Sequence, residues 1–208
     1  MKYLFIDTST NHLIIGLIIN NEIVSYYDEV ITNGMSEHIL PEIEKQFKNN
    51  SLMASQIDAI FVSNGPGSFT GIRVGLTIAK VYAWSLNIKV IPISSLESLA
   101  TTKTSKKYIV PMIDARREYV FAGIYDGDLN SIMNDSYILL NNLFDKTNNE
   151  YEYVSYDEFN NINIVKPSID ILKIIKKHEN DIGVNPHSLN PNYLKLTEAE
   201  EKLGCKND

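Results

Sequence analysis

The chain has 208 residues, 44% hydrophobic and 22% charged, a balance typical of a globular protein with one large domain or two small ones. Its formal net charge of −7 excludes the basic footprint of a protein that binds nucleic acid by itself. The one cysteine, Cys205, excludes a disulfide framework within the chain and predicts a reducing, cytoplasmic location. Asp7 comes too early for a signal peptide, and no uncharged apolar run reaches membrane length, so we expect no membrane association.

Hydrophobic periodicity in the first half of the chain predicts the order β-β-β-α-β-α-β-α. Three strands are expected at residues 3–6, 13–19 and 22–31, with Asn20-Asn21 as a hairpin turn. A helical stripe follows. Ser36 is a candidate N-cap, but Pro41 would then lie just beyond the free first turn and kink the helix, which favours a start nearer Leu40. The remaining elements are a strand at 57–62, a glycine-rich helix, a strand at 89–93 and a short helix at 95–100.

The polar segment 101–107 is a candidate boundary between the two halves. After it we expect strands at 108–113, 119–125 and 136–140, with a hairpin turn at Asp126-Gly127-Asp128. A short helix at 143–144, strands at 151–156 and 162–165, and a helix before His178 complete this half. The tail at 190–194 is predicted to be irregular, and 197–203 to be a charged helical turn.

A faint internal repeat links the two halves. Phe5-Ile6-Asp7-Thr8 and Met112-Ile113-Asp114-Ala115 each close the first strand of a similar β-β-β-α series. The repeat predicts two related lobes, at residues 1–104 and 105–208, that face each other across a cleft. The acid at the end of each first strand is expected to point into that cleft.

The run from Asn64 to Lys80 is the most distinctive stretch of the sequence. A β-branched strand leads into Gly65-Pro66-Gly67, and Ser68 or Thr70 can cap the helix that follows. A glycine turn before a helix N-terminus can bind phosphate, but this run has neither the Walker A ending nor the dinucleotide fingerprint. The alternative is a tight turn that leads into a closely packed helix.

Small residues recur every four positions along that helix, at Gly71, Gly75 and Ala79. Each interior glycine costs about 1 kcal/mol relative to alanine, so a stripe of them indicates close approach of another backbone. The stripe faces either a helix of a partner subunit or the interior of the first lobe. In the first case a Gly75→Leu change would abolish pairing and leave the monomer folded.

Three motifs together resemble the TsaB (YeaZ) family of the actin/sugar-kinase/Hsp70 superfamily. They are Ile6-Asp7-Thr8-Ser9, the glycine run from Gly65 to Gly75, and Asp114-Ala115-Arg116-Arg117-Glu118; Pro191-x-Tyr193-Leu194 is similar to that family's terminal segment. The resemblance implies an α/β fold with two actin-like or sugar-kinase-like lobes, that is, a duplicated ribonuclease H-like β-β-β-α-β-α-β-α unit.

The resemblance also implies a function in making threonylcarbamoyladenosine beside the anticodon of tRNAs that read codons starting with A. In that family the subunit is non-catalytic, pairs with the catalytic subunit TsaD, is joined by the ATPase TsaE, and forms a homodimer when alone. We therefore expect tRNA to be bound only indirectly. The expected partner-binding residues lie on two helices: Ile39, Leu40, Ile43, Phe47, Gly71, Ile72, Gly75, Leu76 and Ala79.

The chemistry of the residues agrees with a non-catalytic subunit. The four histidines, at positions 12, 38, 178 and 187, include no pair four apart, so we expect neither a metal site nor catalytic residues. Asp7, Thr8, Ser9 and Asp114 are candidates for a weak nucleotide cleft, with no cofactor bound tightly and ATP or ADP at the partner interface. Equally, both acids can be turn residues that bond their own backbone.

Two functions from other classes stay open. A small-molecule kinase or ATPase would use Asp7 and Asp114 in phosphotransfer. A metallopeptidase would need the paired histidines that the sequence lacks. Arg116 and Arg117 suit an acidic partner or a phosphate, or plain exposure to solvent.

Overall fold

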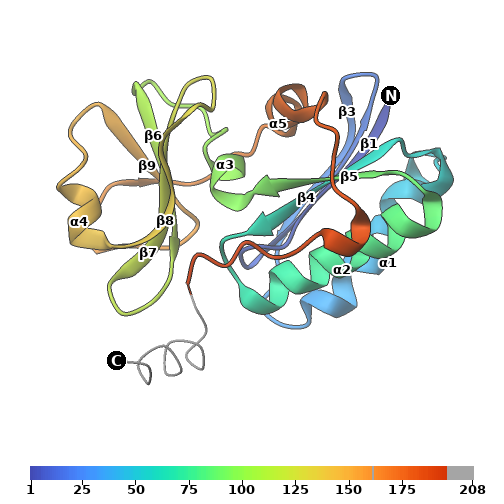
Figure 1. Ribbon diagram of the computed structural model, residues 1–208, viewed down its shortest axis with the longest axis horizontal. Helices are drawn as coiled ribbons and strands as arrows, with labels where there is room; N and C mark the ends of the chain where they lie inside the picture. Colours follow the sequence, from blue (N-terminus) through green and yellow to red (C-terminus); the bar gives the residue numbers. More distant parts are fainter. Residues whose placement is uncertain (161, 196–208) are drawn as a thin grey trace.

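The computed structural model describes residues 1–160 and 162–195 and shows two lobes, each built on a five-stranded sheet (Figure 1). The first sheet consists of β1 (Lys2–Asp7), β2 (His12–Ile19), β3 (Glu22–Val30), β4 (Ala59–Gly65) and β5 (Lys89–Ser94). The second consists of β6 (Tyr108–Asp114), β7 (Tyr119–Asp126), β8 (Ser131–Leu139), β9 (Tyr151–Val154) and β10 (Ile164–Val165). The helices are α1 (Met35–Asn49), α2 (Phe69–Leu86), α3 (Ser95–Leu99), α4 (Leu140–Phe144) and α5 (Ile171–His178), with short 3-10 turns η1 (Ala54–Gln56) and η2 (Pro186–Ser188).

The two sheets have the same topology. The first has the order β3-β2-β1-β4-β5, and the second, read in the same direction, is β8-β7-β6-β9-β10. In each, the first strand pairs antiparallel with the second strand and parallel with the fourth. This duplication confirms the predicted two-lobed actin-like α/β fold. The second half departs from it at one point, because no helix lies between β9 and β10 in the residues described there.

The central strands of the first sheet are buried on both faces, which explains their near-continuous apolar sequences. Phe5 and Phe61 pack on the face covered by α3 and α5. Leu4 and Ile60 pack on the opposite face, beneath α1 and α2. The glycine-rich helix α2 is therefore a core element of the first lobe.

The two lobes share one hydrophobic cluster. Residues of the second sheet, such as Ile113 and Tyr125, belong to the same buried cluster as Phe5 of β1 and Ile171 of α5. Helix α5 returns to the first sheet, where a Cβ on Gly16 of β2 would lie 2.6 Å from Ile171 Cδ1. Helix α5, which follows the second sheet in the chain, therefore packs on the first sheet. The boundary at residue 104 stays a prediction.

Helix α1 begins earlier than predicted. It starts at Met35, after Gly34 in a left-handed conformation (φ 72°), and contains Pro41 in its interior. The expected start near Leu40 is wrong. Ile39, Ile43 and Phe47 are buried along one stripe, and a later start would leave Ile39 outside the helix. Burial of this stripe offsets the cost of about 3 kcal/mol that an interior proline imposes.

Most other elements agree with the sequence prediction within a few residues. Asn20 and Asn21 both have positive φ (50° and 66°), as the predicted hairpin turn requires. The largest shift is in β8, which begins at Ser131 rather than 136, because Asp126 accepts hydrogen bonds from the Asp128 and Asn130 amides and closes a tight turn. The predicted turn at 197–203 and Cys205 lie outside the described residues. Of the helices described, none is long and apolar enough to cross a membrane.

Candidate functional site

A cleft of about 900 Å³ lies between the lobes. One wall comes from the loops after β1 and β3 and from the glycine turn before α2, including Ser9, Asn33 and Ser68. The other wall comes from the end of β6 and includes Asp114 and Arg116. The cleft thus lies where the two repeated first strands end, as the internal repeat predicts.

The glycine turn packs against the loop after β1. Gly67 has φ 149°, and a Cβ there would overlap the carbonyl oxygen of Ser9. Ser68 is the N-cap of α2, as predicted: its hydroxyl accepts a hydrogen bond from the Gly71 amide at 3.2 Å. The Ser68 amide itself donates to Ser9 O at 2.6 Å. Two donors that a phosphate would need are therefore already satisfied within the lobe, which favours the packed-turn interpretation and does not fit a phosphate cradle.

The stripe of small residues on α2 faces the interior of its own lobe. Added Cβ atoms on Gly71 and Gly75 would overlap the carbonyl and hydroxyl oxygens of Thr8, respectively. Thr8 Oγ1 donates to Gly71 O at 2.8 Å, which fixes α2 against the end of β1. The prediction that this stripe faces a partner helix is therefore wrong in its geometry, and the alternative, packing inside the first lobe, is confirmed.

Most of the expected partner-binding residues are likewise buried in the first lobe. Leu40 is 42% exposed. The other eight form its interior: Ile39, Ile43, Phe47, Gly71, Ile72, Gly75, Leu76 and Ala79. In this conformation they support the outer surface of the helix pair rather than form it. Their effect on pairing stays a prediction, and any contact would have to be made through their exposed neighbours.

The outer surface of α1 and α2 carries large apolar side chains, of which the sequence analysis singled out Leu40 alone. Trp84 is 66% exposed and Val81 57%, and Phe69 and Leu40 are also exposed. Val81 and Trp84 lie on neighbouring turns of α2, and clustered exposed apolar residues are typical of a protein-binding surface.

Of the four cleft candidates, Ser9 and Asp114 line the cleft. Asp7, Thr8 and Ser9 are buried, at 4%, 1% and 1% exposure, and Asp7 and Thr8 are not among the lining residues. Asp7 Oδ1 accepts the Ser9 amide at 2.8 Å, and Asp114 Oδ1 accepts the Arg116 amide at 2.8 Å. Both acids thus bond their own turns, as the alternative interpretation predicts.

Burial raises the pKa of Asp7, and the nearby hydroxyls of Ser63 and Ser9 only partly oppose this. Since the folded-state pKa lies above the ordinary value of 3.8, ionised Asp7 reduces the stability of the folded chain at neutral pH. We expect Asp7→Asn to raise the urea midpoint at pH 7. The gain should disappear below pH 3.8, where the carboxyl is protonated in both states. A midpoint lowered at pH 7 would contradict this assignment.

The histidines lie on separate elements. His12 Nδ1 is 2.6 Å from Asp28 Oδ1, and the His12 ring stacks on Tyr156 with 3.6 Å between centroids. His178 lies on α5, His38 on α1 and His187 in η2. In the part of the chain that the structure describes, no three metal-ligating side chains lie close enough together to hold a metal ion.

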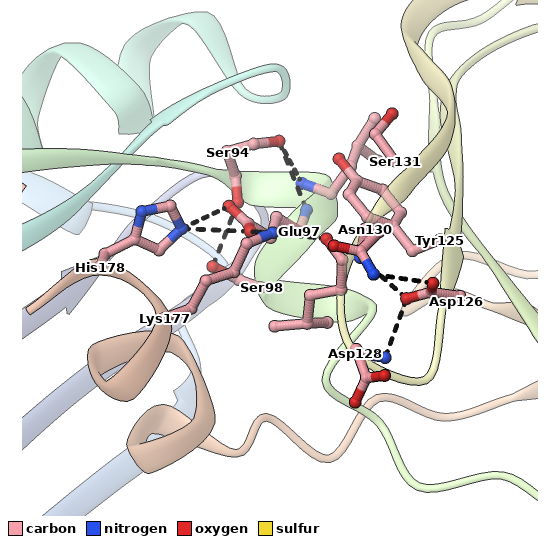
Figure 2. A network of polar contacts seen from close by, with 12 residues as sticks. Ser94, Glu97, Ser98, Tyr125, Asp126, Asp128, Asn130, Ser131, Lys177 and His178 are labelled. Atoms are coloured by element: carbon pink, nitrogen blue, oxygen red, sulfur yellow. Dashed lines mark hydrogen bonds and ion pairs between the residues drawn. The ribbon is translucent and has the colours of Figure 1, made fainter.

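A polar network at the junction of the lobes was not foreseen from the sequence (Figure 2). Glu97 of α3 is 7% exposed, and its carboxylate accepts from Lys177 Nζ at 2.6 Å and lies 3.0 Å from His178 Nε2. Lys177 also donates to Leu129 O in the turn between β7 and β8. The network therefore joins α3, α5 and the second sheet. The missed signal was Glu97, the one charged residue of a short helix whose other residues are serines and leucines.

The ionisation of this network should depend on pH. Hydrogen bonding to Glu97 raises the pKa of His178, against the effect of burial, and Asp181 raises it further. Burial acts to raise the pKa of Glu97, but His178 and Lys177 together outweigh it and lower that pKa.

Because the pKa of His178 is raised on folding, charged His178 stabilises the folded state fully below pH 6.5, the ordinary histidine pKa. This stabilisation is lost as the pH rises through the pKa of His178 in the folded state. Because the pKa of Glu97 is lowered on folding, ionised Glu97 stabilises the folded state above pH 4.5, the ordinary glutamate pKa. This stabilisation is lost as the pH falls through the pKa of Glu97 in the folded state. We therefore expect the stability difference between the wild type and His178→Gln, measured by urea unfolding, to be largest between pH 4.5 and 6.5 and to shrink towards pH 9. A difference that grows with pH would contradict the assigned ion pair.

Comparison with known proteins finds relatives of this chain in one family. A family described as "TsaD: tRNA N6-adenosine threonylcarbamoyltransferase" matches residues 28–187. The tRNA threonylcarbamoyladenosine biosynthesis protein TsaB of Bacillus subtilis is 28% identical over 97% of each chain. The Haemophilus influenzae protein of the same name is 36% identical over 58% of this chain and 52% of its own.

Solved structures show the same fold. A Pseudomonas aeruginosa protein, described as similar to peptidase YEAZ, superposes with a TM-score of 0.80 at 21% identity, covering 93% of this chain and 99% of the other. A second structure, described as YeaZ from that organism, gives 0.77 at 20% identity with the same coverage. The fold is that of a two-lobed α/β protein, and the matched sequence places it in one family. The chain belongs to the family described as TsaD, and its sequence is similar to proteins named TsaB.

Proposed function

We propose that this chain is a non-catalytic platform subunit in the biosynthesis of tRNA threonylcarbamoyladenosine. It pairs with and activates TsaD, the subunit that transfers the threonylcarbamoyl group, and it acts in the cytoplasm. The observation that carries the proposal is the match to the Bacillus subtilis TsaB protein over 97% of both chains. The net charge of −7 supports indirect contact with tRNA, because a basic footprint is absent from the sequence.

The arrangement of the cleft supports a non-catalytic subunit. Asp7 is buried and bonded to its own turn, and the amides of Ser68 and Gly71 are satisfied within the lobe. His12 and His178 pair with carboxylates that lie in different parts of the molecule. Binding of ATP or ADP at the partner interface stays a prediction.

The exposed face of α1 and α2 is the proposed partner surface. Trp84 is its largest exposed side chain, and buried aromatic anchors contribute most of the energy in many interfaces. Beneath this face, the eight buried residues of the two helices set its shape. The same face would form the homodimer in the absence of TsaD, and TsaE would join the assembled pair.

We expect Trp84→Ala to weaken pairing with TsaD by at least about 2 kcal/mol, roughly 30-fold in Kd, without lowering the stability of the isolated chain. Titration calorimetry with the purified TsaD homologue measures the affinity, and urea unfolding measures the stability. Ile132→Ala, a 53% exposed residue on β8 of the other lobe, is the matched control and should bind normally. Equal affinities for the two variants would reject this surface.

The proposed function is tested by co-purification with the TsaD homologue of the same organism and by tRNA modification assays with each subunit omitted. We expect a stable pair, and loss of modification when either protein is left out. ATP hydrolysis by the isolated chain that Asp7→Ala abolishes would favour the kinase or ATPase alternative. Metal analysis of the purified chain addresses the metallopeptidase alternative in the same preparation.

A further inference from the structure

The segment after α5 reaches helix α2 at η2 and runs beside it towards the N-terminal end of that helix (Figure 1). We call residues 186–195 the strap. Near its start, the ring of His187 lies 6.5 Å from that of Trp84, close to the C-terminus of α2. Leu189 is 1% exposed and belongs to the core between the first sheet and α2. At the other end of the helix, Tyr193 stacks on Phe69.

The strap is fastened most closely at the N-terminus of α2. The Asn192 amide donates to Asn64 O at 2.7 Å, at the end of β4. Tyr193 stacks on Phe69 with 5.3 Å between centroids, and its hydroxyl accepts from Arg73 Nε at 2.6 Å. The Arg73 guanidinium lies 3.8 Å from the centre of the Phe69 ring, so Tyr193, Phe69 and Arg73 form one stack.

Beyond this stack the strap reaches the second lobe. Lys195 Nζ lies 5.3 Å from the centre of the Tyr137 ring on β8. Tyr137 in turn stacks on Tyr119 of β7, with 4.4 Å between centroids and 10° between planes. The strap therefore contacts both lobes within three residues.

Both attachment points adjoin opposite walls of the cleft. Phe69, beneath Tyr193, lines the cleft from the first lobe. Phe121, the strand partner of Tyr137, lines it from the second. A cation–π contact contributes only about 0.5–2 kcal/mol, so the link to the second lobe can open without unfolding of either lobe.

We propose that the strap, residues 186–195, restrains the second lobe relative to helix α2 and so limits the opening of the cleft. Tyr193 is its positioning residue, because it joins the strap to the first lobe, and Lys195 makes the link to the second. Release of the strap lets the lobes separate about the shared core and the Glu97 network, which stay in place. This inference concerns the isolated chain and does not depend on a partner.

The test measures the distance between the lobes in the full-length chain. Spin labels are placed at two exposed positions, Lys48→Cys on α1 and Asn142→Cys on α4, with Cys205→Ser to remove the native thiol. The labelled chain is mixed with an excess of unlabelled chain, so that pulsed electron resonance gives the distribution of distances between the two labels of one chain. In parallel, hydrogen exchange of the Asn192 amide reports whether the strap is seated on Asn64 O.

We expect one narrow distance distribution in the otherwise unchanged chain. Tyr193→Ala/Lys195→Ala should add a population at longer distance and speed Asn192 exchange at least tenfold. Lys195→Ala alone should broaden the distribution while Asn192 stays protected, and it serves as the second variant if the double variant folds poorly. Lys146→Ala, an exposed lysine of the second lobe away from the strap, should change neither measurement.

Two results would overturn the proposal. Fast Asn192 exchange with an unchanged distance distribution would show that the lobes keep their places without the strap. Undiminished Asn192 protection in the double variant would show that Tyr193 and Lys195 do not fasten it.

Discussion

Gly75→Leu is expected to destabilise the isolated chain by at least about 3 kcal/mol, enough to leave much of it insoluble. Even a single Cβ at this position would overlap the Thr8 hydroxyl, with Ile6 Cγ2 3.7 Å away. Thr8 cannot turn aside freely, because its hydroxyl holds the carbonyl of Gly71. Urea unfolding of the purified variant measures the loss. Weaker pairing would follow from unfolding rather than from a blocked interface.

The matched control is Thr77→Leu, an exposed position one half-turn further along α2. The side chain there meets solvent, and the change should alter stability by less than about 1 kcal/mol. A Gly75→Leu chain as stable as the wild type, yet unable to pair, would restore the original expectation that this glycine faces a partner.

Glu97→Gln is expected to cost about 3 kcal/mol, the second largest loss of stability among these variants. The change leaves Lys177 and His178 facing an uncharged group in a site where the Glu97 side chain is only 9% exposed. Because Lys177 also holds Leu129 O, the loss should be accompanied by faster amide exchange in the turn between β7 and β8. Urea unfolding at pH 6 measures the free energy.

Two further variants separate the network from ordinary surface charge. Lys45→Met removes the partner of Glu42 in a pair whose lysine is 61% exposed, and should cost less than about 1 kcal/mol. Glu97→Gln/Lys177→Met removes both partners and should recover part of the loss, since replacing a buried pair is less costly than breaking it. A double variant no more stable than Glu97→Gln would show that Glu97 and Lys177 do not stabilise the chain as a pair.

Most of the fold could be predicted from the sequence, because the formation of these strands, turns and caps depends on residues that are adjacent in the chain. The apolar strands β1, β4 and β6, the Asn20-Asn21 turn and the Ser68 cap all follow from periodicity and backbone preference. The repeated strand-end acids predicted the duplicated topology and the place of the cleft. The early start of α1 could not be predicted, because tertiary burial of Ile39 overrides the local effect of Pro41.

The candidate site was predicted less well, since it depends on which face each element turns to the core. The spacing of Gly71 and Gly75 correctly indicated close approach of another group, but periodicity does not say whether that group is Thr8 or a partner helix. The Glu97 network joins residues about 80 positions apart in the chain, and no local pattern reports such a pairing. The sequence contains Trp84, but the pattern around it does not indicate that its side chain is exposed.

The most direct test of the platform function is the rate of tRNA threonylcarbamoylation by the TsaD homologue as this chain is titrated in. With Trp84→Ala we expect at least tenfold more chain to be needed for half-maximal rate, with the same maximum at saturation. Asp7→Asn/Asp114→Asn should match the wild type in both quantities. A double carboxyl variant that binds TsaD normally but abolishes modification, together with an unaffected Trp84→Ala, would contradict the proposed function.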